Sequence, residues 1–184
     1  MCAMPRGLTA LTAMFAPGQE VPGLDALIAE LLECARAKWP DFAVADEDFA
    51  RYTVERLPAD VEVEAALRCV RAADLYLACA CARGNEAALR AVETYYFHHV
   101  DTALRRLGRN PSEVDEAKQA LREKLFVGDP PKIATYSGQG ALSRWLWVTS
   151  VRDAIRTRER TREVPAEDDL LELPALANDP ELSY

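Results

Sequence analysis

Residues 85–108 read NEAALRAVETYYFHHVDTALRRLG, and they indicate the fold class most clearly. Its apolar residues, from Leu89 to Leu107, recur at three- and four-residue intervals, which is the spacing of one buried face of an α-helix. Asn85 is a favoured N-cap residue, and Gly108 is a favoured residue just past a helix end. Helical periodicity recurs along the rest of the chain, and no stretch alternates as a strand does. The sequence therefore predicts an all-α fold.

Further helices follow from the same periodicity and from the residues that start and stop helices. Asp74 is expected to cap a helix, and the glycine and proline residues of 128–132 and 136–140 predict loops. The expected helices cover residues 24 to about 39, 46 or 48 to 57, 61–73, 75–82, 111–125 and 141–160.

The helix predicted at 111–125 has an apolar and a polar side. Its apolar residues Val114, Leu121 and Leu125 fall on one face and are expected to be buried. Its polar residues are expected to point outward: Lys118, Gln119, Arg122 and Glu123.

Length and composition describe an ordinary soluble protein. The chain has 184 residues, a formal charge of −8 and 49% apolar residues, which fits one domain with at most an accessory segment. No apolar run approaches the roughly 20 residues of a membrane span, and the N-terminus lacks the apolar centre of a signal peptide. The sequence predicts a cytoplasmic protein without a membrane partner, whose five cysteines are reduced.

Charge is distributed unevenly along the chain. Residues 1–104 carry a net charge of −7, residues 105–162 carry +6, and residues 163–184 carry −7. A basic block between acidic flanks is typical of a surface that binds nucleic acid or another polyanion. The alternative is a helix face that is merely solvated.

No group of residues predicts catalysis or metal binding. Cys79-Ala-Cys81 lacks the spacer of a zinc motif, and His98 and His99 are expected to point apart on their helix. No serine lies in a nucleophile motif, and no glycine run resembles a phosphate loop. The sequence predicts a protein that is not an enzyme and has no catalytic residue, metal site or cofactor.

The basic block does contain an ordered pattern. Arg152, Arg156 and Arg160 recur every four residues, so they form one row with members about 6 Å apart along a helix. Tyr136 and Trp145 precede this row. Aromatic rings beside arginines suit single-stranded DNA, whose bases stack on rings while cations follow the backbone. For Trp145 a place in the core is the favoured interpretation.

Residues 74–162 resemble the second region of bacterial sigma factors, in the extracytoplasmic-function group of the sigma-70 family. Three motifs carry the resemblance, and the third is the most specific. They are LYLACACARGNEAALRAVETYY at 75–96, VDEAKQ at 114–119, and YSGQGALSRWL at 136–146, which an arginine-rich helix follows.

The resemblance implies a helical domain that directs RNA polymerase to promoters and assists strand opening at the −10 element, without a cofactor. Its implied partners are core RNA polymerase and single-stranded promoter DNA, and it leaves room for an anti-sigma factor. The implied polymerase-binding residues are Asp115, Glu116 and Gln119. The implied DNA-binding residues are Tyr136, Gln139, Arg144, Arg152, Arg156 and Arg160.

The chain also departs from the family. Arg152 and Arg156 stand where the family usually has Asn and Asp, and Lys118 and Arg122 stand where it usually has apolar residues. Residues 1–73 match nothing in the family's core and are expected to be a helical N-terminal extension.

Residues 163–184 are expected to be an acidic linker. The family's fourth region, a helix-turn-helix, is absent, and a helix start at 178–181 predicts that a further helical domain follows. Two other functions remain open. One is a helical module that docks on polymerase or a regulator without opening promoters, and the other is an unrelated helical nucleic-acid-binding protein.

Overall fold

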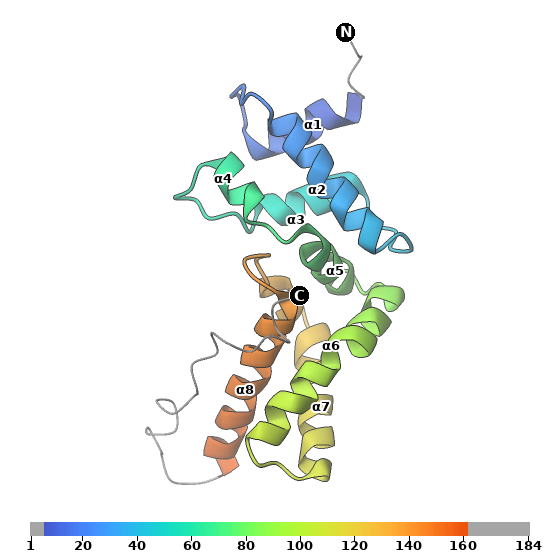
Figure 1. The fold of residues 1–184 in the computed structure, drawn as a ribbon, viewed down its shortest axis with the longest axis vertical. Helices are drawn as coiled ribbons and strands as arrows, with labels where there is room; N and C mark the ends of the chain where they lie inside the picture. Colours follow the sequence, from blue (N-terminus) through green and yellow to red (C-terminus); the bar gives the residue numbers. More distant parts are fainter. Residues whose placement is uncertain (1–5, 162–184) are drawn as a thin grey trace.

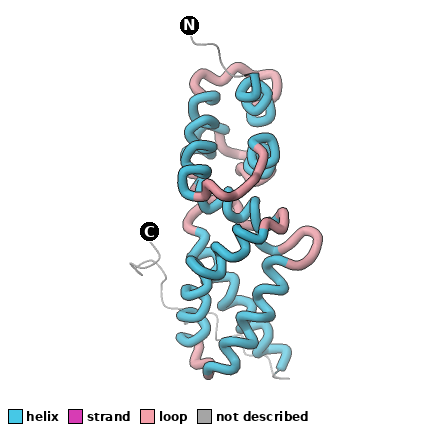
Figure 2. Tube along the Cα trace, turned by 90° about the vertical axis from the view of Figure 1, so that its right-hand side faces the viewer, coloured by secondary structure: helices cyan, strands magenta, loops and turns pink. Residues whose placement is uncertain are grey.

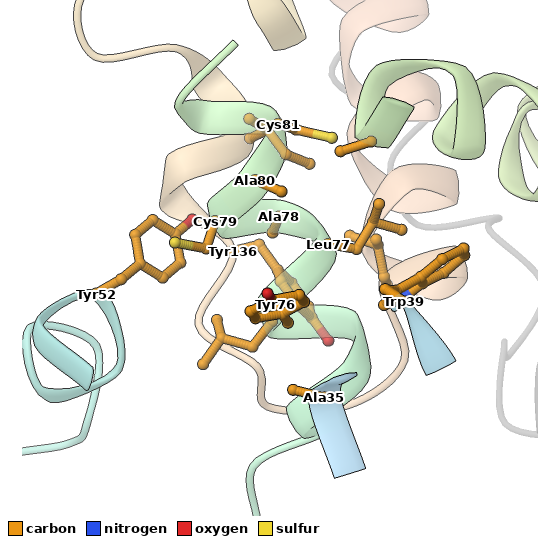
Figure 3. Close-up of a cluster of buried hydrophobic side chains, with 14 of the residues drawn as sticks. Ala35, Trp39, Tyr52, Tyr76, Leu77, Ala78, Cys79, Ala80, Cys81 and Tyr136 are labelled. Carbon is orange, nitrogen blue, oxygen red and sulfur yellow. The ribbon is translucent and has the colours of Figure 1, made fainter. Parts of the chain in front are cut away.

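The segment AADLYLACACA at residues 72–82 has small or apolar side chains on nearly every side, so one buried stripe cannot accommodate it. In the computed structural model it forms helix α5 (Ala72–Ala82), in which residues 74–81 are all buried. Helices α2, α3 and α6 and the short helix η1 pack around it. Figure 3 shows Trp39, Tyr52 and Tyr136 gathered around α5 from other parts of the chain.

The structure describes residues 6–161, and side chains from residue 10 to residue 158. These described residues form α-helices and one 3-10 helix, and they contain no strand, so the predicted all-α class is confirmed for them. Besides α5, the elements are α1 (Arg6–Phe15), α2 (Leu24–Lys38), α3 (Asp46–Val54), α4 (Val63–Arg68), α6 (Glu86–Arg106), α7 (Pro111–Phe126), η1 (Lys132–Thr135) and α8 (Leu142–Thr161).

The helices lie in an elongated arrangement with α5 near the middle (Figure 1). Helices α1 to α4 lie at one end, where α1 packs on α2 and α3, and α2 packs on α4. Helices α6, α7 and α8 run side by side at the other end, as both views show (Figures 1 and 2). The basic block of the sequence therefore lies in this second group of helices.

Local signals set the ends of the long helices. Asn85 accepts a hydrogen bond from the Ala88 amide at 3.0 Å and so caps α6, as predicted. Helix α7 begins with a capping box, in which Asn110 and Glu113 each accept a hydrogen bond from the other's backbone amide. These side chains satisfy amides that no helical carbonyl can reach.

The single helix predicted at 61–73 is wrong. Helix α4 ends at Arg68, and α5 begins only at Ala72. Between them Val70 forms an antiparallel bridge with Gln139, and the Arg71 amide donates a hydrogen bond to the Gly138 carbonyl at 3.0 Å. Backbone pairing with a distant loop therefore replaces the helical hydrogen bonds that the periodicity alone would favour.

The larger of two buried hydrophobic clusters runs through most of the described chain, and the smaller one consists of Ala103, Trp147 and Val151. The larger cluster joins residues from α1 to α8, including residues on both sides of the boundary predicted between 73 and 74. The predicted linker at 163–184 lies outside the described residues. Among the described helices, none is sufficiently long and apolar to cross a membrane.

Candidate nucleic-acid interface

Helix α7 presents the residues to which the resemblance assigns polymerase binding. Asp115, Glu116 and Gln119 are all exposed. The opposite face is buried as predicted, with at most 1% exposure for its apolar residues Val114, Leu121 and Leu125. Helix α7 therefore exposes a polar face, while its apolar face is packed in the core.

Lys118 and Arg122 are only partly exposed and pair with another helix, so the prediction that they simply point outward is wrong for these two residues. Lys118 pairs with Asp101 at 3.4 Å, and Arg122 pairs with Glu93 through two nitrogens while its guanidinium lies over the Phe97 ring. Both acids belong to α6, so these pairs join α7 to α6. Hydrogen bonds from Arg105 and then Lys118 hold the pKa of Asp101 below its usual value.

The first two members of the arginine row lie on the outer side of α8. Arg152 and Arg156 are exposed, and neither forms an ion pair with a side chain that the structure describes. Arg160 lies within α8, but its side chain is outside the described part. Asp153, on the side of α8 that faces α7, does have a partner: it forms an ion pair with Lys124 of α7. The outward arginines are thus available for a partner of opposite charge.

Tyr136 does not offer its ring to solvent. Its side chain is 1% exposed, and its hydroxyl donates a hydrogen bond to the Gly140 carbonyl at 2.6 Å. The ring also meets Trp145 edge to face, at 5.9 Å between centroids. A DNA base therefore cannot reach the Tyr136 ring to stack on it in this structure, because the side chain is buried and bonds within its own loop.

Other residues near this loop remain accessible. Gln139 and Arg144 are exposed, as a DNA-contacting role requires. Trp145 is half-buried and packs against the core. Trp145 and Arg152 are seven residues apart and lie on the same side of α8. The loop and α8 thus combine a polar side chain, a half-buried tryptophan and exposed arginines.

Two positions that matter here were not predicted from the sequence. Asp74 was expected to cap α5, but its carboxylate lies inside that helix and accepts hydrogen bonds from the Tyr96 hydroxyl at 2.9 Å and the Leu142 amide at 3.0 Å. It therefore caps α8. Arg56 donates to the Ala134 carbonyl at 2.9 Å. An Asp within an apolar helix only weakly indicates that it will cap another helix. Nothing in the sequence around Arg56 indicates its bond to Ala134.

The cysteine and histidine pairs do not form a metal site with other described residues. Cys79 and Cys81 are both buried in the core, and burial raises the pKa of each thiol to about 12. The expectation that His98 and His99 point apart is wrong, since their ring centroids lie 3.8 Å apart.

Comparisons with protein-family models, with curated proteins and with solved structures found no match to this chain.

Proposed function

We propose that the chain is a sigma factor, or the part of one, that binds core RNA polymerase through α7 and the −10 promoter strand through α8 and the preceding loop. The observation that carries the proposal is the state of Arg152 and Arg156. The chain has an excess of acidic residues and a net charge of −8, yet these two exposed arginines have no ion-pair partner among the described side chains. Such a pair suits phosphates.

The two surfaces divide the work. Asp115, Glu116 and Gln119 hold the protein on polymerase, which brings α8 to the promoter. The loop and α8 then bind unpaired bases better than paired ones, and this difference in affinity shifts the DNA toward the open state. Trp145 supplies the stacking ring in place of the buried Tyr136, and the arginines follow the backbone.

A salt titration tests the proposal. Wild-type protein assembled with core polymerase first selects a preferred strand from a randomised single-stranded DNA library. Binding of that strand and a scrambled one is then measured against salt. Replacing Arg152 and Arg156 by Ala should flatten the log–log slope by about 1.4 and weaken both strands alike, since each phosphate contact contributes about 0.7.

The matched control replaces Arg51 and Arg90 by Ala, which changes the net charge equally on exposed parts of α3 and α6. It should leave the slope unchanged. A wild-type slope in the Arg152/Arg156 variant would show that the row is only solvated and would overturn the proposal.

Burial of Tyr136 favours a second candidate, a module that docks on polymerase without capturing a base. It predicts that the wild-type assembly selects no preferred strand although α7 still binds polymerase. The same selection experiment therefore separates the two functions.

A further inference from the structure

The N-terminal extension reaches the loop at residues 132–141 through Arg56. This side chain is 16% exposed, and its residue lies two positions past the last residue of α3. Its Nε donates to the Ala134 carbonyl at 2.9 Å, while Nη1 donates to the Tyr52 carbonyl at 2.7 Å. The guanidinium also lies over the Tyr52 ring, 3.3 Å from its centroid. Arg56 is thus fixed to α3 and holds η1 by its carbonyl.

The turn between α4 and α5 holds the same loop at a second point. The Arg71 amide donates to the Gly138 carbonyl, and Val70 pairs with Gln139. Gly138 is buried at φ +78°, and a Cβ on it would come within 3.3 Å of Val70 and Leu75 side-chain atoms. The loop backbone therefore rests directly on this turn, and only glycine fits there without strain.

These contacts decide which loop groups face solvent. With its backbone held at Ala134 and Gly138, the loop turns Tyr136 inward and leaves Gln139 exposed. Charged hydrogen bonds such as that of Arg56 are among the stronger ones in proteins. A loop held in this way has little freedom to present Gln139 differently.

We infer that the N-terminal extension holds the loop in place, and that Arg56 and Arg71 are positioning residues that fix which base the loop accepts. The inference rests on the proposed function for its meaning in base selection. Arg56 acts through its side chain, and Arg71 acts through its backbone amide. The extension thereby sets selectivity without contacting DNA.

The first measurement is hydrogen exchange in the full chain, which needs neither polymerase nor DNA. Arg56→Ala should make amides of 132–141 exchange about tenfold faster, with α7 unchanged, because a charged hydrogen bond to the loop is lost. Arg56→Lys keeps a donor and should restore part of the protection. Arg51→Ala, at an exposed position of α3, should change nothing.

A second variant keeps the test decisive if Arg56→Ala does not fold. Arg71→Pro removes the amide that bonds Gly138 at a residue whose φ of −80° proline can adopt. It should loosen the loop as Arg56→Ala does, whereas Arg71→Ala keeps the amide and should not. Unchanged loop exchange in both Arg56→Ala and Arg71→Pro would overturn the inference.

The second measurement uses the polymerase assembly and the selected and scrambled strands. Arg56→Ala and Arg71→Pro should lower the preference for the selected strand while affinity for the scrambled strand stays the same. An unchanged preference in variants with a loosened loop would overturn the role in selectivity. If the wild-type assembly itself selects no strand, the proposed function fails. Whether the N-terminal extension holds the loop in place is then still judged by hydrogen exchange alone.

Discussion

At the scale of single residues, Asp74 joins parts of the chain that are far apart in sequence. Its two oxygens accept hydrogen bonds from the Tyr96 hydroxyl and the Leu142 amide, so one carboxylate links α5, α6 and α8. Asp74→Ala should lower the free energy of unfolding by about 2–4 kcal/mol, because it leaves two buried donors without partners. Urea denaturation measures this loss.

Asp41→Ala is the control for this prediction, since Asp41 is exposed. It should change stability by less than about 0.5 kcal/mol. A similarly small effect for Asp74→Ala would show that the carboxylate does not hold the three helices together.

The residues that hold the loop show what sequence reasoning misses. Gly138 and the arginines could be recognised as a turn and as basic residues, because those properties are local. The partners of Asp74, Arg56 and Tyr136 depend on which carbonyls and amides the fold brings within about 3 Å. The prediction that Tyr136 binds DNA, made from its place before the arginine row and from the resemblance, therefore assigned an exposed role to a ring that is buried.

At the scale of secondary-structure elements, each side of helix α7 has a different role. Apolar residues meet the core, Lys118 and Arg122 pair with α6, and Asp115 and Gln119 are exposed. Replacing Asp115 and Gln119 by Ala should weaken binding to core polymerase while lowering stability by less than about 0.5 kcal/mol. Polymerase pull-down titrations and urea denaturation measure the two effects.

The matched control removes an acid and a glutamine from exposed positions elsewhere, as Glu33→Ala with Gln19→Ala. Its polymerase affinity should equal that of the wild type. A large loss of stability without a loss of affinity in the α7 variant would mean that Asp115 and Gln119 are structural.

Helix positions were predictable where their causes lie within a few residues. The cap at Asn85 and the buried stripe of α7 follow from adjacent sequence. The break between α4 and α5 was not, because its cause is pairing with residues 138 and 139, almost seventy positions later. The ion pairs of Lys118 and Arg122 likewise depend on acids of α6.

At the scale of the whole molecule, the larger buried cluster extends through most of the helices and contains groups that can ionise. Cys79 and Cys81 are buried on α5, and Tyr52 lies beside Cys79, as Figure 3 shows. The Tyr52 hydroxyl has no hydrogen-bond partner among the described residues, and burial raises its pKa. Ionising any of these groups places a charge in the core.

Because these ionisable groups are buried, we expect the free energy of unfolding to fall at alkaline pH. Burial raises the pKa of each thiol from 9.0 to about 12, so the folded chain keeps protons that the unfolded chain releases above pH 9. Since the unfolded state then binds fewer protons, the free energy of unfolding falls as pH rises, by up to about 1.4 kcal/mol per pH unit for each thiol. Urea denaturation from pH 8 to pH 10, with reductant present, measures the slope.

The variant Cys79→Ala with Cys81→Ala isolates the contribution of the thiols to this slope. It should be less stable at every pH because it leaves small cavities, but it should lose less stability between pH 9 and 10 than the wild type does. Tyrosines contribute mainly at higher pH, since their ordinary pKa is 10.0. Equal slopes for the two proteins would show that the thiols already ionise in the folded chain, in contradiction to their buried positions.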